Sequence, residues 1–137
     1  MKKLVVVTGA SSGIGAATAK AFSEAGYPLL LLARRLDPMK ELNLPETICR
    51  SVDILDRGAL GNAIEVAEKK YGPTEYLINN AGIMFNGNPV KQSPEEWDEM
   101  IDINLKGVMN GIHSVLPGMV ERESGTIVNL GSIAGRK

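Results

Sequence analysis

A glycine-rich run near the amino terminus has the composition of a loop that binds phosphate. The run Thr8-Gly9-Ala10-Ser11-Ser12-Gly13-Ile14-Gly15 follows the apolar segment 4–7 and opens a helical pattern. In that context Gly9 permits a tight turn, Gly13 lets the backbone approach a pyrophosphate, and Gly15 allows the helix to pack closely on the strand. The free N–H groups and the dipole of the helix then face the anion. The alternative is a purely structural turn. The predicted cofactor-binding residues of the loop are Gly9, Ser11, Ser12, Gly13, Ile14 and Gly15.

Two arginines after the second apolar run indicate which dinucleotide the loop would bind. An acidic residue at the end of this strand would hydrogen-bond the ribose 2′-hydroxyl and favour NAD. Here Ala33 is followed by Arg34 and Arg35, and the next acid is Asp37. Guanidinium groups match phosphate geometry bidentately. We therefore expect NADP(H) as the cofactor; the alternative is two solvated loop arginines.

An asparagine interrupts the apolar stripe of a later helix. Asn104 follows Ile101 and precedes Val108 at helical spacing, which predicts a buried amide. Leaving that amide without a partner would cost roughly 1–3 kcal/mol, so something must bond to it. Either a backbone group or a catalytic role would satisfy it. The stripe itself is predicted as Trp97, Met100, Ile101, Val108, Ile112 and Val115.

Strand-like and helical segments alternate along the chain and would position these groups. Short apolar runs at 4–7, 29–32, 47–52, 76–78 and 126–130 read as buried strands. The segments between them carry helical spacing, and right-handed crossovers place such helices on both faces of a parallel sheet. We expect an α/β fold, a doubly wound parallel sheet of the Rossmann type, with strand order 3-2-1-4-5. The 137 residues suit a single domain, 1–137.

Helix-end signals sharpen this assignment. Ser93, Pro94 and Glu96 form a capping box that starts one helix, and Gly26 ends another as a C′ residue. Pro117-Gly118 should kink or end the helix that carries Asn104.

Each strand leads into a polar or glycine-rich group, so these groups should meet at one edge of the sheet.

Four motifs, in order, resemble those of the short-chain dehydrogenase/reductase family. They are the Thr-Gly-x-x-x-Gly-x-Gly run, Asn79-Asn80-Ala81-Gly82, Asn104, and Gly131-Ser132-Ile133-Ala134-Gly135. The likeness spans nearly the whole chain and looks closest to NADP-dependent members acting on small hydroxy acids or related alcohols. It implies an oxidoreductase that transfers a hydride between the nicotinamide and a small alcohol, hydroxy acid or carbonyl compound.

The resemblance also implies roles for single residues. Ser132 would hydrogen-bond the substrate carbonyl, and Asn104 would perturb its helix and hold a water in a proton relay. Asp53 would accept a hydrogen bond from the adenine amino group, with the Ile54 backbone beside it. Arg34 is the arginine better aligned with the 2′-phosphate. Along the NNAG motif, Asn79 would tie the sheet together, while Asn80, Ala81 and Gly82 would lie beside the cofactor. The structural alternative for Asp53, Asn80 and Ser132 is a turn residue in each case.

The family's general acid/base lies outside the motifs found. It is the tyrosine of a Tyr-x-x-x-Lys motif downstream of the serine, and the sequence ends at Lys137 without one. Tyr27, Tyr71 and Tyr76 do not have the required spacing. We therefore expect the chain to be the amino-terminal portion of such an enzyme, truncated after strand 5 and inactive alone. The alternatives are a catalytically inactive dinucleotide-binding module completed by another chain, and an epimerase or dehydratase of the extended family.

Composition excludes several other classes. The net charge of −1 argues against nucleic acid or an anionic membrane as a partner. Cys49 is the single cysteine, so we expect no internal disulfide and no metal site. The longest apolar run, 29–33, is too short to span a bilayer. We expect a cytoplasmic homo-oligomer whose partner is a small-molecule alcohol or carbonyl substrate.

Overall fold

Five parallel strands form one sheet in the order β3-β2-β1-β4-β5. The structure, a computed structural model, describes residues 2–85 and 87–133. The predicted strand order and fold class are confirmed, and β4 begins earlier than expected. The strands are β1 (Leu4–Thr8), β2 (Leu29–Ala33), β3 (Thr47–Ser51), β4 (Thr74–Asn79) and β5 (Thr126–Asn129).

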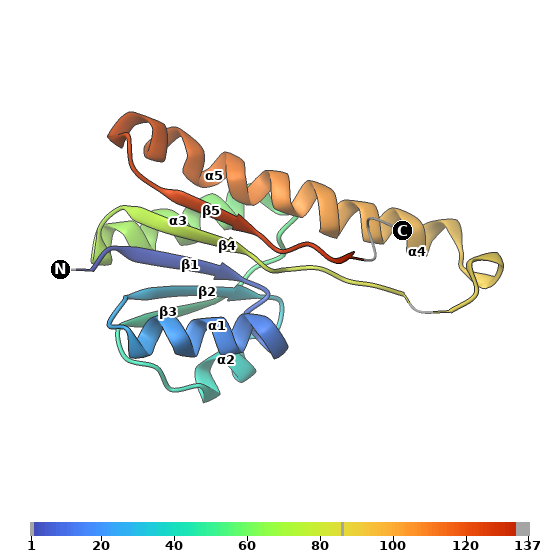
Figure 1. Ribbon diagram of the computed structural model, residues 1–137, viewed down its shortest axis with the longest axis horizontal. Helices are drawn as coiled ribbons and strands as arrows, with labels where there is room; N and C mark the ends of the chain where they lie inside the picture. Colours follow the sequence, from blue (N-terminus) through green and yellow to red (C-terminus); the bar gives the residue numbers. More distant parts are fainter. Residues whose placement is uncertain (1, 86, 134–137) are drawn as a thin grey trace.

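Helices cover both faces of this sheet (Figure 1). One face packs against α1 (Gly13–Glu24) and α2 (Asp37–Glu41), the other against α3 (Arg57–Tyr71) and α5 (Gly107–Arg122). Side chains of β1 alternate between the two cores: Val5 and Val7 join the α1 side, Leu4 and Val6 the α3 side. Because both faces are buried, the central strand is apolar from Leu4 to Val7.

The helix-end signals predicted at Ser93 and Gly26 are confirmed. Ser93 begins α4 (Pro94–Ile101) with a full capping box: the Glu96 N–H donates to Ser93 Oγ and the Ser93 N–H to Glu96 Oε2, both at 3.2 Å. Gly26 follows α1 in the left-handed region, with φ of 87°. A short 3-10 turn, η1 (Pro89–Lys91), precedes α4.

The stripe predicted on the helix that carries Asn104 is wrong in its first half. Helix α4 continues into α5 through a π-helical segment, η2 (Asp102–Lys106), and the three form one long rod (Figure 1). A π turn contains more residues than an α turn, so the faces before and after it are out of phase. Trp97 and Ile101 are therefore about half exposed, and Ile103 is buried instead.

Pro117 does not end helix α5, which runs on to Arg122. Proline lacks an N–H, so the carbonyl of His113 loses its helical partner. Both Pro117 and His113 are exposed, so water can satisfy that carbonyl. Val115 and Met119, on either side of the proline, are buried in the core and hold both halves of the helix to the sheet.

Strand β5 is the outer strand of the described sheet beyond β4. Ile127 packs against the core shared with α3 and α5, whereas Val128 and Leu130 are exposed. Across the described ranges, none of the helices has the length and apolar character needed to cross a membrane.

Candidate functional site

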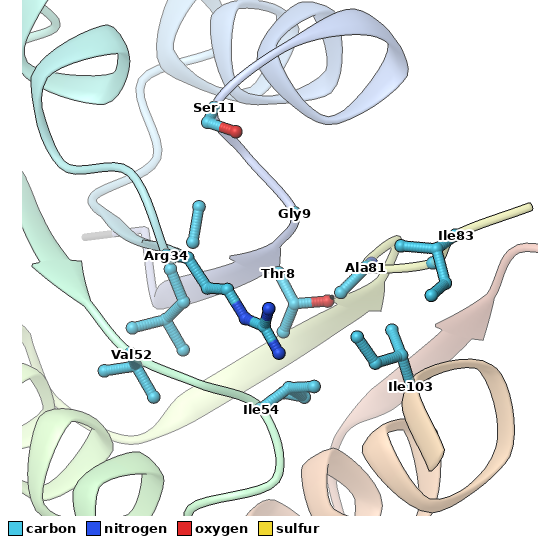
Figure 2. Close-up of a pocket in the computed structure, with 12 residues that line it drawn as sticks. Thr8, Gly9, Ser11, Arg34, Val52, Ile54, Ala81, Ile83 and Ile103 are labelled. Atoms are coloured by element: carbon cyan, nitrogen blue, oxygen red, sulfur yellow. Dashed lines mark hydrogen bonds between the residues drawn. The ribbon is translucent and has the colours of Figure 1, made fainter. Parts of the chain in front are cut away.

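A pocket of about 200 Å³ opens at the carboxyl ends of the strands, beside the point where the strand order reverses between β1 and β4. This is the position at which open α/β sheets bind ligands. Residues that follow β1, β2, β3 and β4 meet at this edge, among them Gly9, Arg34, Ile54 and Ala81 (Figure 2). The pocket is lined by Thr8, Gly9, Ser11, Leu32, Ala33, Arg34, Val52, Ile54, Ala81, Gly82, Ile83 and Ile103.

Hydrogen bonds between β1 and β4 fix the start of the glycine loop. Thr8 Oγ1 accepts the N–H groups of Asn80 and Ala81, each at 3.0 Å. The Asn80 side-chain amide donates to the Gly9 carbonyl at 3.1 Å. A Cβ on Gly9, whose φ is 64°, would lie 2.8 Å from Ala81 Cα, so this close approach requires glycine. Asn80 and Ala81 thus hold the loop in place.

The beginning of α1 is open to solvent. Gly13 has a φ of 54°, and no atom lies within 4 Å of the position a Cβ would take. Ser12 is the N-cap residue, but its side chain makes no capping hydrogen bond, so the first N–H groups of the helix stay available to a ligand. A Cβ on Gly15 would collide with the Gly9 carbonyl. Ile14, predicted to bind the cofactor, is exposed in this open first turn.

Arg34 extends across the pocket between Ile54 and Thr8 (Figure 2). Its guanidinium lies 3.6 Å from the carboxylate of Asp53, and both side chains are about half exposed. Its backbone carbonyl accepts a hydrogen bond from Ser51 Oγ at 2.7 Å, which fixes the end of β2 to β3. An exposed ion pair of this kind contributes only about 0–1 kcal/mol, so Arg34 can exchange Asp53 for another anion. Arg35 is exposed and does not line the pocket.

The wall opposite the glycine loop is apolar. Val52 and Ile54, in the segment that joins β3 to α3, are largely buried, and their side chains face the pocket (Figure 2). Ile103, from η2, completes this wall. A planar aromatic ring would find apolar contacts here beside the polar Arg34 and Asp53. Ligand pockets commonly combine an apolar lining with a few polar groups that fix the ligand's orientation.

Asn104 is exposed, contrary to the prediction of a buried amide. Its side chain bonds both backbone groups of Ile83: Oδ1 accepts the N–H at 2.8 Å and Nδ2 donates to the carbonyl at 2.7 Å. The backbone partner considered as the structural alternative is therefore present. The π-helical segment around Asn104 turns this amide toward the chain after β4, where Gly82 leaves room for it.

Ser132 follows β5 and is exposed, at the same edge of the sheet but outside the pocket. The last residues of its motif, Ala134 and Gly135, lie outside the described residues. Asn79 Nδ2 donates to Asn129 Oδ1 at 2.9 Å and so joins β4 to β5. Within residues 2–85 and 87–133, no group of three or more His, Cys, Asp or Glu side chains could hold a metal ion.

Six lining residues were not predicted as site residues: Thr8, Leu32, Ala33, Val52, Ile83 and Ile103. Thr8 belongs to the glycine motif, and a hydroxyl at a strand end could have marked it as an anchor. Ile83 directly follows the NNAG motif, so its position could also have been extrapolated. Ile103 could not have been found, because it faces the pocket only through the phase change at η2.

Comparison with known proteins agrees with this geometry. The family model described as short chain dehydrogenase matches residues 3–137. An uncharacterized oxidoreductase of Listeria monocytogenes is 40% identical over 98% of this chain and 57% of its own length. The acetoacetyl-CoA reductase of Paracoccus denitrificans is 40% identical over 100% and 57%. The closed form of a serine dehydrogenase complexed with NADP+ superposes with a TM-score of 0.92 at 34% identity, over 98% of this chain and 56% of that one. The chain thus spans little more than half the length of these relatives.

Proposed function

Because the chain belongs to the short-chain dehydrogenase family, we propose that it is the cofactor-binding part of an NADP(H)-dependent oxidoreductase. The choice of NADP(H) rests on the position of Arg34, whose side chain crosses the pocket beside the glycine loop. An acidic residue at this strand end would favour NAD instead. The solved serine dehydrogenase that superposes on this chain was complexed with NADP+.

The residues present fit such a cofactor. Gly13 leaves open space at the start of α1, where a pyrophosphate would meet free N–H groups. The apolar wall of Val52 and Ile54 would take the adenine, with Asp53 at its edge, and Arg34 would bind the 2′-phosphate. When bound, the nicotinamide supplies or accepts the hydride, and the protein orients it.

The reaction class we propose is reduction of a small carbonyl compound, or the reverse oxidation of an alcohol or hydroxy acid. Ser132 would donate a hydrogen bond to the substrate oxygen. Asn104 would hold the chain after β4 through Ile83 and, with its perturbed helix, keep a water of a proton relay in place. The names of two relatives, an acetoacetyl-CoA reductase and a serine dehydrogenase, support substrates with a carbonyl or hydroxyl beside an acid or its derivative.

We expect Arg34→Ala to remove the preference for NADPH over NADH. A charge-assisted hydrogen bond contributes about 1.5–3 kcal/mol, or roughly tenfold to a hundredfold in affinity. Titrations of both cofactors by nicotinamide fluorescence measure the ratio of dissociation constants. Arg35→Ala is the matched control, because Arg35 does not line the pocket. Equal affinities in the unmodified chain, or an unchanged ratio in Arg34→Ala, would refute the assignment of NADP(H).

A catalytically inactive dinucleotide-binding module is the second candidate. The observation that favours it is that each tyrosine of residues 1–137 lies away from the pocket. Tyr27 precedes β2, Tyr71 ends α3 and Tyr76 is within β4. The coding sequence downstream of codon 137 separates the two candidates. A Tyr-x-x-x-Lys motif there supports the oxidoreductase, and its absence supports the module.

We also propose that the protein self-associates through the rod formed by α4, η2 and α5. Large apolar side chains recur along its exposed face at intervals of four and seven residues, which is typical of a helix that packs against another. Family members commonly pair through the helix that carries this asparagine. The exposed residues of the face are Trp97, Ile101, Leu105, Met109, Leu116 and Val120.

Met109→Glu should shift the protein toward monomer, because a desolvated, unpaired carboxylate in an apolar interface is costly. Light scattering at several protein concentrations measures the change. Ala21→Glu introduces the same charge at an exposed position of α1, which covers the other face of the sheet, and should leave the mass unchanged. A monomeric unmodified chain, or identical masses for the two variants, would argue against this interface.

A further inference from the structure

Helix α5 presses directly on the wall of the pocket that would take the adenine. Gly107, its first residue, is buried against Ile54: a Cβ on Gly107 would lie 2.8 Å from Ile54 Cγ2 and 3.3 Å from Cγ1. Ile54 is itself largely buried, and its side chain faces the pocket (Figure 2). The absence of a side chain at position 107 therefore sets how far Ile54 projects into the pocket.

A second residue of the same helix fixes the backbone of Ile54. Asn110 is 6% exposed, and its side-chain Nδ2 donates to the Ile54 carbonyl at 3.0 Å. Its Oδ1 accepts from Nε of Arg57, at the start of α3, at 2.9 Å. Both polar ends of the amide are thus satisfied, one by the segment that carries the apolar wall and the other by the first residue of α3. A buried amide without these partners would be unfavourable, so the contact is geometrically specific.

We propose that Gly107 and Asn110 are positioning residues that set the shape of the adenine pocket from outside it, and so set the affinity for the adenosine half of the dinucleotide. Neither residue lines the pocket. Gly107 contacts the Ile54 side chain on the side away from the pocket, and the hydrogen bond from Asn110 keeps the Ile54 backbone from moving away from the pocket. This inference rests on the proposed function, since it assumes that the wall of Val52 and Ile54 binds adenine.

Gly107→Ala separates this role from a merely structural one. A purely structural role predicts a change in stability alone, lowered by crowding against Ile54 and raised by the higher helix propensity of alanine, with unchanged affinity. Under the proposal the new methyl group pushes Ile54 into the pocket, because the β-branched side chain cannot swing away and Asn110 holds its carbonyl. Affinity for adenosine 2′,5′-bisphosphate, which lacks the nicotinamide half, should fall at least about tenfold.

Asn110→Asp gives an independent measurement. A carboxylate can still accept from Arg57 but cannot donate to the Ile54 carbonyl, so only the link to the pocket wall is lost. We expect a loss of similar size. Because the adenine wall is common to both cofactors, NADPH and NADH should weaken by the same factor in both variants, unlike the outcome for Arg34→Ala. His113→Ala, an exposed residue of the same helix, is the control and should bind as the unmodified chain does.

A double-mutant cycle completes the test. Ile54→Ala removes the atoms that Gly107→Ala would displace, so in that background the Gly107 substitution should change affinity by less than about twofold. Isothermal titration with adenosine 2′,5′-bisphosphate gives the affinities, and thermal unfolding gives the folded fraction to which they are corrected. Suppose that the unmodified chain binds the probe. If the variants then match its affinity after this correction, or if the two substitutions of the cycle act independently, this inference alone is overturned. Unmodified chain that fails to bind the probe overturns the proposed function and this inference with it.

Discussion

A polypeptide of residues 1–137 will not turn over NADPH with small aldehydes or ketones at an enzymatic rate. The family's general acid/base is the tyrosine of a Tyr-x-x-x-Lys motif, and this sequence has none. General acid–base catalysis contributes about 10²–10⁴-fold. The lysine of the motif also holds the nicotinamide ribose, and misplacement by about 1 Å can cost another ~10²-fold. The residues that we propose to hold the adenosine and the pyrophosphate, by contrast, lie within residues 1–137.

The tyrosines of the chain cannot substitute for the missing one. Tyr27 and Tyr76 pack against each other and against Phe22, with the Tyr27 and Tyr76 ring centroids 5.7 Å apart. The hydrogen bond with Tyr27 raises the pKa of Tyr76 above its ordinary value, the opposite of the shift that a phenolate base requires. Tyr71 is the last residue of α3, at the amino end of the sheet.

The measurement follows NADPH absorbance with a panel of carbonyl compounds, beside a fluorescence titration that shows NADPH bound. Light scattering should find association, because β5 presents an open edge with exposed Val128 and Leu130. A monomer that turns over any substrate at about 10 s⁻¹, an ordinary enzyme rate, would show that catalysis does not use the tyrosine, and the mechanism would have to be abandoned.

Gly13→Val will abolish dinucleotide binding. The position of the Cβ on Gly13 is open space next to the free N–H groups of α1, where the pyrophosphate would lie, so a branched side chain would occupy the ligand's volume. The backbone φ of 54° is also unfavourable for valine, at a cost of about 1–2 kcal/mol. Titration with NADPH should show no saturable change in fluorescence.

Gly26→Val is the matched control for this substitution. Gly26 also has a positive φ, 87°, and open space around its Cβ position, but it lies at the opposite end of α1. Both variants should lose stability, and only Gly13→Val should lose binding. A folded Gly13→Val protein with normal NADPH affinity would mean that the phosphate site has been placed wrongly.

Local signals in the sequence were sufficient for the fold and for much of the pocket. Alternating apolar runs define a parallel sheet because such strands are buried on both faces, and the capping box at Ser93 fixes one helix start by hydrogen bonds within four residues. The glycine loop and Arg34 follow strands directly, so their position at the carboxyl edge follows from the topology.

Features that depend on packing between distant segments could not be read in this way. The π-helical turn at η2 exposes Trp97 and Ile101 and buries Ile103. The resemblance implied that Asn104 perturbs its helix, but not which side chains the change of phase would expose or bury. The contact of Gly107 with Ile54 and the bond from Asn110 to the Ile54 carbonyl join residues more than fifty positions apart. Pro117 lies in mid-helix because the carbonyl it frees faces solvent, which a local rule cannot anticipate.

The bonds from Asn80 and Ala81 to Thr8 also govern when the site can form during synthesis on the ribosome. Asn80 follows Thr8 by 72 residues, and β1 pairs with β4 only after β2 and β3 have been made. While residues 9–15 leave the exit tunnel, nothing yet holds the Gly9 carbonyl or occupies the hydroxyl of Thr8. Translation supplies about 5–20 residues per second, so the Gly9 carbonyl and the Thr8 hydroxyl stay without these partners for several seconds, although the Ala10 N–H can bond the Leu32 carbonyl earlier. Under the proposed function, the complete site for a dinucleotide would therefore form only after residue 81 has emerged, and a cofactor that requires it would not assist the folding of β1, α1 and β2 before then.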